Sequence, residues 1–256
     1  MKDIAIKAAY AAGEVLIKNF KKKYILQKNN QNKIVTDIDL MSEDIIIKII
    51  KKSFPEHEIL SEETRSKITN PHDYLWIIDP LDGTINYISG NPFFNVTIAL
   101  QLHEETILGV TYSPITNELF VADKNSNLQY NNRQLKINGA KKLSDAILCV
   151  DWSHCNKENQ TKMHKLFSLL TPKVRTVLSY GCGALSAAHV ATGYFDVYFN
   201  IQSYPWDHIA ACFMVQKAGG ISTTVNGDLQ KGLTHSVLVS NNKLHNSVLE
   251  YLKKVL

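Results

Sequence analysis

The sequence has few cysteines, no long apolar run and no strong excess of one charge. Its four cysteines, Cys149, Cys155, Cys182 and Cys212, lack the paired spacing of a metal site, and we predict reduced thiols in a cytoplasmic protein. No stretch approaches the length of a membrane-spanning helix. The first residues carry an early acid, Asp3, and no apolar core, which argues against a signal peptide. We therefore expect no membrane partner.

The charge balance also excludes one class of partner. The formal net charge is +4 over 256 residues, and the basic residues are evenly spread. This balance suits small anionic molecules and argues against nucleic acid as a partner. With 45% hydrophobic residues and no internal repeat, the chain can bury a large core as one or two closely packed domains.

One stretch, residues 76–84, carries the strongest chemical signal. Trp76-Ile77-Ile78 predicts a buried strand, and the following Asp-Pro-Leu-Asp-Gly-Thr predicts the sharp turn that leaves it. Two carboxylates at the end of a buried strand are costly unless a cation lies between them, and a hard divalent cation prefers oxygen ligands. The glycine allows close approach of a ligand, and the threonine adds a hydroxyl. The first hypothesis is therefore a metal-dependent phosphate site.

The first half reads as helices followed by an antiparallel meander. Helices are predicted over residues 3–20 and 40–50, the second with Thr36 as its cap, and strands over 96–100, 107–112 and 118–122. Asp37 and Asp39, at the start of the second helix, either complement the helix dipole or serve the site. A short strand from Ile59 runs into adjacent acids, which suggests that two strand ends share one site. The segment 27–33 is predicted to be a mobile loop.

The second half alternates strands and helices. Strands are predicted at 146–152, 174–179, 195–199 and 236–239, and helices at 160–170, 183–191, 206–218 and 243–252. We divide the chain into an N-terminal α+β half, 1–140, and a C-terminal α/β half, 141–256. Asp207 follows a rigid Pro205-Trp206 pair, and it is either a helix cap or a ligand from this half.

Several segments, in this order, resemble the inositol monophosphatase family of lithium-sensitive, magnesium-dependent phosphatases. They are Val-Thr-Asp-Ile-Asp at 35–39, Ser-Glu-Glu at 61–63, Asp-Pro-Leu-Asp-Gly-Thr at 79–84, Ala-Thr-Gly at 191–193, Trp-Asp at 206–207 and Ala-Gly-Gly at 218–220. The resemblance covers nearly the whole chain. It implies an α+β fold, a layered α-β-α-β-α sandwich of the inositol monophosphatase and fructose-1,6-bisphosphatase type, and a homodimer.

The resemblance also implies a ligand set for two to three Mg²⁺ ions. Glu62, Asp79 and the backbone carbonyl of Leu81 would hold the first ion. Asp79, Asp82 and Asp207 would hold the second, and a third would lie near Glu62. An all-oxygen set without His or Cys suits Mg²⁺ and disfavours zinc.

The other catalytic roles that the resemblance implies fall on or near residues 76–84. Thr84 and Asp39 would orient the attacking water and form the catalytic set with Glu62. The N–H groups of Gly83 and Thr84, at the start of a following helix, would bind the phosphate. Glu63 and Lys28 match family residues close to the site. The implied activity is Mg²⁺-dependent hydrolysis of a phosphomonoester, most simply inositol monophosphate, by direct attack of water.

The substrate pocket is expected in the second half. The matching positions are Gly181, Cys182, Gly183 and Asn200, where inositol-specific members carry Glu in place of Asn200. The alternatives are NADP, 3′-phosphoadenosine phosphate, fructose bisphosphate and histidinol phosphate. An alternative of another class is a regulatory protein that binds the transcription machinery, although a pure binder has no need of four converging carboxylates. Trp206 and His208 are predicted to pack rather than bind metal.

Overall fold

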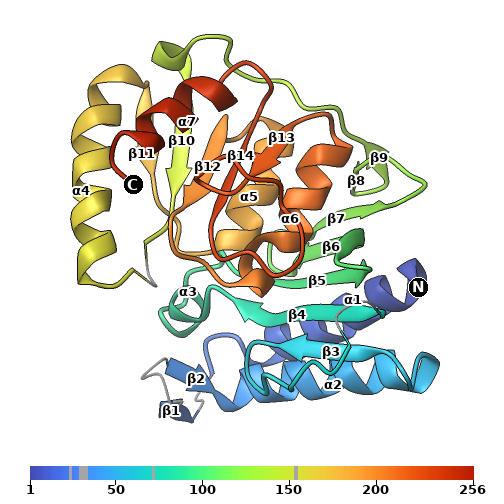
Figure 1. Cartoon of the computed structure of the whole chain (residues 1–256). Coiled ribbons are helices and arrows are strands. Elements are labelled where there is room, and N and C mark those ends of the chain that lie inside the picture. The colour runs from blue at the N-terminus through green and yellow to red at the C-terminus, as the bar shows by residue number, and fades with distance from the viewer. Residues whose placement is uncertain (23–24, 29–33, 71–72, 153–154) are drawn as a thin grey trace.

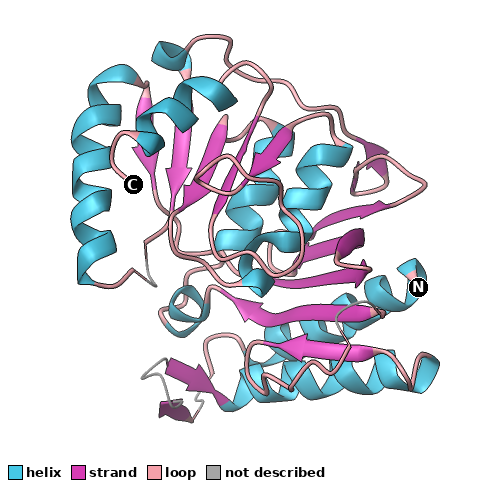
Figure 2. Cartoon of the chain, viewed as in Figure 1, coloured by secondary structure: helices cyan, strands magenta, loops and turns pink. Residues whose placement is uncertain are grey.

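The computed structural model describes residues 1–22, 25–28, 34–70, 73–152 and 155–256. Its helices and sheets stack in five layers, α-β-α-β-α. In Figure 1 the first layer of helices is at the bottom, and the last is at the left and top. Figure 2 shows the same layers coloured by helix and strand. This confirms the predicted layered α+β sandwich. No helix in these ranges is both long and apolar enough to cross a membrane.

The first layer consists of α1 (Lys2–Asn19) and α2 (Asp37–Ser53), which pack together on the seven-stranded sheet. Helix α1 buries alanines at helical spacing, including Ala5, Ala8 and Ala12, so its backbone can lie close to the sheet. Helix α2 begins with a reciprocal cap between Thr36 and Asp39, as the sequence predicts.

The second layer is a seven-stranded sheet in chain order. Strands β3 and β4 are parallel, and every later pair is antiparallel, which confirms the predicted meander. The strands are β3 (Glu58–Ser61), β4 (Leu75–Asp82), β5 (Asn95–Leu102), β6 (Glu105–Ser113), β7 (Glu118–Asp123), β8 (Gln129–Tyr130) and β9 (Arg133–Gln134).

Strand β4 is longer than predicted. Its ladder with β5 continues to Asp82, so the prediction that the turn starts at Asp79 was wrong. The register passes from Asp79 opposite Thr97 to Asp82 opposite Asn95, which puts one extra residue on β4. Such a bulge tolerates Pro80, which cannot donate to the ladder. Because residues three apart on a regular strand face opposite sides, the extra residue allows both aspartates to face one side.

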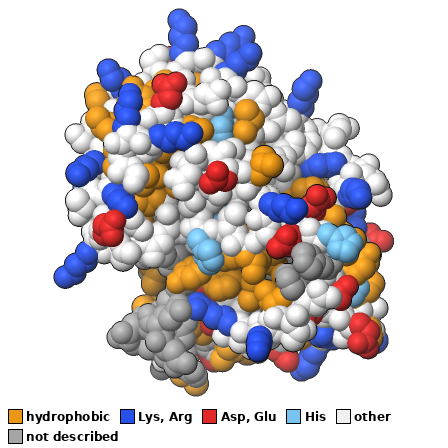
Figure 3. Space-filling view, viewed as in Figure 1, with side chains coloured by type: hydrophobic (Ala, Val, Ile, Leu, Met, Phe, Trp, Pro, Cys, Tyr) orange, Lys and Arg blue, Asp and Glu red, His pale blue; other side chains and the backbone are white. Residues whose placement is uncertain are grey.

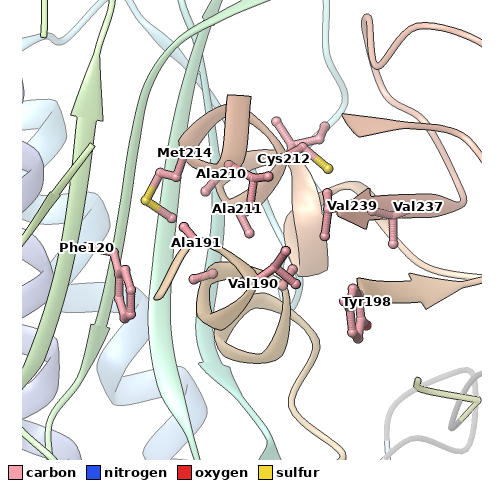
Figure 4. Close-up of a cluster of buried hydrophobic side chains, with 14 of the residues drawn as sticks. Phe120, Val190, Ala191, Tyr198, Ala210, Ala211, Cys212, Met214, Val237 and Val239 are labelled. Atoms are coloured by element: carbon pink, nitrogen blue, oxygen red, sulfur yellow. The ribbon is translucent and has the colours of Figure 1, made fainter. Parts of the chain in front are cut away.

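The middle layer is formed by α5 (Gly183–Thr192) and α6 (Pro205–Lys217), which contact both sheets. Figure 4 shows their small residues, such as Ala191 and Ala211, between Phe120 of the first sheet and Tyr198 of the second. A side chain at Gly109 of β6 would place Cβ 2.8 Å from the Ala210 carbonyl oxygen, so α6 lies almost against the sheet backbone. This core draws residues from both halves, and the boundary at residue 140 stays a prediction.

The fourth and fifth layers complete the sandwich. The five-stranded sheet has the order β11 (Thr176–Leu178), β10 (Ile147–Val150), β12 (Val197–Asn200), β14 (Val237–Ser240) and β13 (Ile221–Thr223). Strand β10 is parallel to both of its neighbours, and the other pairs are antiparallel. Helices α4 (Lys157–Leu170) and α7 (His245–Lys253) cover the outer face. Strand β13 was not predicted, because it is short and follows the Gly219-Gly220 stop directly.

The smaller elements are divided between the two sheets. Strands β1 (Leu26–Lys28) and β2 (Ile34–Thr36) and helix α3 (Thr84–Ile88) lie near the end of β4, and two short 3-10 turns, Leu143–Asp145 and Thr171–Lys173, precede β10 and β11. The predicted loop at 27–33 begins inside β1, and residues 29–33 lie outside the described part of the chain. All four cysteines are buried and free of disulfides. Lys and Arg side chains are scattered over the face shown in Figure 3 rather than gathered in one patch.

Candidate metal and phosphate site

A cavity of about 650 Å³ lies where the carboxyl ends of strands from both sheets meet α3, α5 and α6. Among the described residues its lining contains no Lys or Arg. It contains five carboxylates: Glu62, Asp79, Asp82, Asp151 and Asp207. Four of these were predicted as metal ligands from the sequence, and Asp151 was not.

Glu62 reaches the cavity because β3 and β4 run in parallel. Ser61 is the register partner of Ile78, and the N–H of Glu62 donates to the Ile78 carbonyl oxygen at 3.1 Å. Glu62 and Asp79 are the next residues after the paired Ser61 and Ile78. The two strand ends therefore lie side by side, as the sequence suggested, and their service in one site stays a prediction.

Asp207 comes to the same place from the first turn of α6. Its Oδ2 accepts the N–H of Tyr204 at 2.9 Å and the hydroxyl of Ser203 at 3.3 Å, so it caps the helix. Carboxylate oxygens of Glu62, Asp79 and Asp207 nevertheless lie within 4.8 Å of one another. The two readings of Asp207, helix cap and site residue, are thus compatible.

The electrostatics of this cluster favour a cation. Burial raises the pKa of Asp79 well above its ordinary value, and the charges of Glu62, Asp82 and Asp207 raise it further. Three carboxylates within 4.8 Å, from three separate segments of the chain, are stable together only when protonated or bridged by positive charge. Oxygen ligands at such spacing fit Mg²⁺, so the residues present fit the metal that the sequence predicts.

Asp82 is held differently from the other acids. Its Oδ2 accepts the Asn95 amide at 2.8 Å and the Ala184 N–H at 2.8 Å, and its Oδ1 accepts the Gly183 N–H at 3.2 Å. Burial raises its pKa to about 6 in spite of these bonds. Asp82 is not among the three clustered acids, and its role as a ligand stays a prediction. Asn95 and Ala184 were not predicted, because their contacts with Asp82 depend on the tertiary fold.

Thr84 connects the end of β4 to α2. Its hydroxyl lies 3.2 Å from Asp39 Oδ1 and 3.1 Å from the Leu81 carbonyl oxygen. Asp39 also accepts the backbone N–H of Thr36 at 2.8 Å, and burial raises its pKa to about 6. Asp39 therefore both caps the helix and contacts the site. Asp37 instead accepts the Ile25 N–H at 2.9 Å, away from the cavity lining.

Gly83 forms the corner between β4 and α3. Its φ of 90° is a left-handed conformation that glycine adopts at little cost, and a Cβ there would lie 3.1 Å from the Phe93 carbonyl oxygen. The corner turns the chain immediately after Asp82, so Thr84 is the first residue of α3.

Arg65 links the two halves of the site, and no motif in the sequence predicted this role. Its Nε donates to the Glu62 carbonyl oxygen at 3.0 Å. Its guanidinium lies 5.4 Å from the ring centroid of Tyr204 and 5.1 Å from that of Trp206, and these two rings are stacked. Trp206 thus packs as predicted. Together these contacts connect the end of β3 to the start of α6.

A model of the inositol monophosphatase family matches residues 1–256. The chain belongs to the inositol monophosphatase family. Nus factor SuhB of Pasteurella multocida is 35% identical over 246 residues, which are 94% of this chain and 88% of that protein. Nus factor SuhB of Escherichia coli K12 is 33% identical over 255 residues, 99% of this chain and 96% of that protein.

Solved structures agree with this assignment. An inositol monophosphatase from Anabaena is 32% identical, with a TM-score of 0.86 over 100% of this chain and 96% of that one. The extragenic suppressor protein suhB from Bartonella henselae is 27% identical, with a TM-score of 0.91 over 99% and 98%. The family and its fold are therefore those that the motifs indicate.

The substrate side of the family site is only partly as predicted. Gly181, Gly183 and Asn200 line the cavity. Cys182 does not, which corrects its assignment to the pocket lining. Its thiol is buried because it turns toward β4, where Sγ donates to Asp82 Oδ2 at 3.2 Å. Burial beside this carboxylate raises the pKa of the thiol well above its usual value, so it stays a thiol.

Two neighbouring residues, His208 and Glu63, are not part of the cavity lining. The Nδ1 and Nε2 atoms of His208 pair with the hydroxyls of Ser203 and Thr234, at 2.9 and 3.0 Å, and burial lowers its pKa to about 3. The prediction that His208 packs within the protein is confirmed. Lys28 is the last residue of β1, and its side chain lies outside the described part of the chain.

Proposed function

We propose that this protein is a Mg²⁺-dependent phosphomonoesterase that hydrolyses a small phosphorylated polyol, in the first place inositol monophosphate. The observation that carries the proposal is the convergence of Glu62, Asp79 and Asp207 within 4.8 Å at a cavity without a described Lys or Arg. Family membership supports the same chemistry.

The proposed ligand set uses the carboxylates in two groups. Glu62, Asp79 and the Leu81 carbonyl would hold one Mg²⁺, Asp79, Asp82 and Asp207 would hold another, and a third would lie near Glu62. Bound Mg²⁺ neutralises the phosphate, lowers the pKa of water and stabilises the leaving alkoxide. The hydrogen bonds from Asn95 and Ala184 hold the Asp82 carboxylate in one orientation.

The chain's own residues position the nucleophile. Thr84 Oγ1 accepts a hydrogen bond from the attacking water and donates its own proton to Asp39 Oδ1, which lies 3.2 Å away. The pKa of Asp39, raised to about 6 by burial, leaves it ionised at neutral pH and suited to this acceptor role. The N–H groups of Gly83 and Thr84 hold the phosphate oxygens. Water adds to phosphorus as the P–O ester bond breaks; the water gives up one proton and the leaving alkoxide takes up one, so the products are the alcohol and inorganic phosphate.

The test is phosphate release from a panel of phosphomonoesters at millimolar Mg²⁺. The panel comprises inositol monophosphate, NADP, 3′-phosphoadenosine phosphate, fructose bisphosphate and histidinol phosphate, each assayed with the native protein, Asp82→Asn and Asn200→Glu. Mg²⁺-dependent release that Asp82→Asn abolishes supports the enzyme. Absence of phosphate release from every substrate would refute the proposed activity. The best substrate, and its change in Asn200→Glu, decides between inositol monophosphate and the alternatives.

Two further properties belong to the proposal. We propose a homodimer, which sedimentation or light scattering tests. We also propose inhibition by Li⁺, and unchanged turnover at concentrations on the order of tens of millimolar, below the range of strong charge screening, would count against it.

A second candidate function is regulatory binding to the transcription machinery. The curated relatives named Nus factor SuhB favour it. Purified RNA polymerase and Nus factors, tested for binding to the native protein and to Asp82→Asn, separate the two functions. Binding by both forms supports a regulatory role independent of hydrolysis, and binding by neither argues against it.

A further inference from the structure

Two neighbouring strands of the five-stranded sheet end together at the cavity. Strands β10 and β12 are parallel, with Val150 opposite Phe199, and the N–H of Asp151 lies 3.4 Å from the Phe199 carbonyl oxygen. Asp151 is the residue after β10, and Asn200 is the last residue of β12. The two side chains therefore start from adjacent positions of the ladder.

Both side chains belong to the face that carries the site. Leu148 and Val150 pack in the outer core beside α4 and α7, whereas Cys149 and Tyr198 pack in the middle core. Because successive side chains on a strand alternate, Asp151 and Asn200 follow Cys149 and Tyr198 toward the middle layer. Both residues line the cavity, and less than a tenth of each is exposed.

The pair presents one acceptor and one donor. Asn200 Oδ1 accepts the N–H of Gln202 at 3.0 Å, which orients the amide and leaves Nδ2 as the group that can donate to a bound molecule. The Asp151 carboxylate only accepts. A hydroxyl group both donates and accepts, so adjacent hydroxyls match this pair. An ammonium group only donates, and it would meet the Asn200 amino group unfavourably.

Charge adds a second filter. The described lining has five carboxylates and no Lys or Arg, and Asp151 is the acid on the five-stranded sheet, apart from the three clustered acids. A second phosphate on the leaving group would lie against the Asp151 carboxylate without a described cation to pair with. Such like-charge contact selects strongly against a ligand.

We propose that Asp151 determines specificity: its carboxylate, beside the Asn200 amide, binds adjacent hydroxyls of a polyol monophosphate and rejects substrates that carry a second phosphate. The inference rests on the proposed phosphatase function. It names the residue that determines which alcohol the substrate can carry as its leaving group.

The test compares kcat/KM for inositol monophosphate, phenyl phosphate and fructose 1,6-bisphosphate. Phenyl phosphate has no hydroxyls to bind, so it reports on the reaction alone. Asp151→Asn should lower the ratio of inositol monophosphate to phenyl phosphate by about tenfold to a hundredfold, the size of a lost hydrogen bond to a charged group. The loss should appear mainly in KM. The fructose bisphosphate to phenyl phosphate ratio should rise by about tenfold.

Two controls isolate the position of the charge. Asp145→Asn removes an exposed carboxylate outside the cavity and should leave both ratios unchanged. The double variant Asp151→Asn/Asn200→Asp moves the carboxylate one strand across and should restore most of the preference for inositol monophosphate. Thermal melting of each variant verifies folding, and the exchange keeps the test valid if Asp151→Asn alone folds poorly.

The outcomes separate this inference from the function on which it rests. Hydrolysis of phenyl phosphate with both ratios unchanged in Asp151→Asn and in the exchange variant overturns the role of Asp151 and leaves the phosphatase intact. A native protein that releases phosphate from none of the three substrates overturns both.

Discussion

The parallel strands β3 and β4 of the first sheet and the parallel strands β10 and β12 of the second bring their carboxyl ends to one cavity. The first pair leads to Glu62 and Asp79, whose carboxylates cluster with Asp207. The second pair leads to Asp151 and Asn200, an acid beside an oriented amide. We call these two places the reaction edge and the recognition edge.

The difference between the edges lies in how their charges are balanced. At the reaction edge, burial and neighbouring negative charges raise the pKa of Asp79, so the edge is complete only with a cation. At the recognition edge the Asn200 amide, a hydrogen-bond donor, lies beside the Asp151 carboxylate, so this edge suits a neutral ligand. We infer that the first edge controls the reaction with any substrate, and that the second controls which substrate reacts.

The largest expected effect is that of Asp79→Asn at the reaction edge. Asparagine keeps the shape and can still accept the Leu81 N–H at Oδ1, a bond of 3.0 Å in the native protein, but it removes the charge shared by the proposed ions. We expect kcat/KM to fall by about 10³-fold on every substrate. Without metal at pH 7.5 the variant should melt at a higher temperature than the native protein, because a buried charge is gone.

Asp145→Asn is the matched control for this prediction, since it removes an exposed carboxylate. Asp151→Asn supplies the comparison with the recognition edge. If it lowered activity on all substrates as severely as Asp79→Asn, the division between the two edges would be wrong.

The next effect concerns the hydroxyl that joins the reaction edge to α2. Thr84→Val keeps the volume but removes the group that lies 3.2 Å from Asp39 Oδ1. We expect kcat to fall by about 10²-fold, the usual contribution of a positioned proton-transfer group, with a smaller change in KM. Thr84→Ser should recover most of the loss. A Val variant as fast as the Ser variant would remove Thr84 from the mechanism.

Arg65→Met probes the connection between the first half and α6. It removes the 3.0 Å bond to the Glu62 carbonyl and the stacking on Tyr204 and Trp206. Each contact contributes about 1 kcal/mol, so we expect the Mg²⁺ concentration for half-maximal activity to rise by about tenfold or more. The Mg²⁺ concentration that Arg65→Lys needs for half-maximal activity should lie between those of the native protein and Arg65→Met. An unchanged Mg²⁺ requirement would mean that Glu62 and Asp207 keep their spacing without Arg65.

Local sequence signals predicted the acids of the reaction edge but not how they are held. Glu62 and Asp79 follow apolar runs, and Asp207 follows Pro205-Trp206, so each had a visible strand or helix end beside it. The bulge in β4 has no such signal, because it depends on the register with β5. Asn95 and Arg65 act through contacts between distant segments.

The recognition edge was harder still to predict. Asp151 was included in a predicted strand over 146–152 as an ordinary strand residue. Its place beside Asn200 follows from the parallel pairing of β10 with β12, which brings together residues that are 49 positions apart and separated in sequence by α4 and α5. Composition and periodicity describe one segment at a time, whereas this site depends on the order of strands in a sheet.

The smallest expected effect is a pH-dependent change in stability at the reaction edge. Burial raises the pKa of Asp39 and of Asp82 to about 6, above the ordinary value of 3.8. The folded, metal-free protein therefore binds these protons more tightly than the unfolded chain. This contribution to stability is complete below about pH 4 and is lost as pH rises through about 6.

Mg²⁺ should reverse that loss, because it binds the ionised carboxylates of the folded state. Melting curves with EDTA or with about 10 mM Mg²⁺, at pH 5 and pH 7.5, measure the difference. We expect Mg²⁺ to raise the melting temperature by roughly 2–4 °C per kcal/mol of binding free energy at pH 7.5, and by clearly less at pH 5. Asp79→Asn should reduce the rise, and Asp151→Asn should largely retain it. Equal Mg²⁺ effects at both pH values would mean that the carboxylates of the reaction edge do not bind the ion.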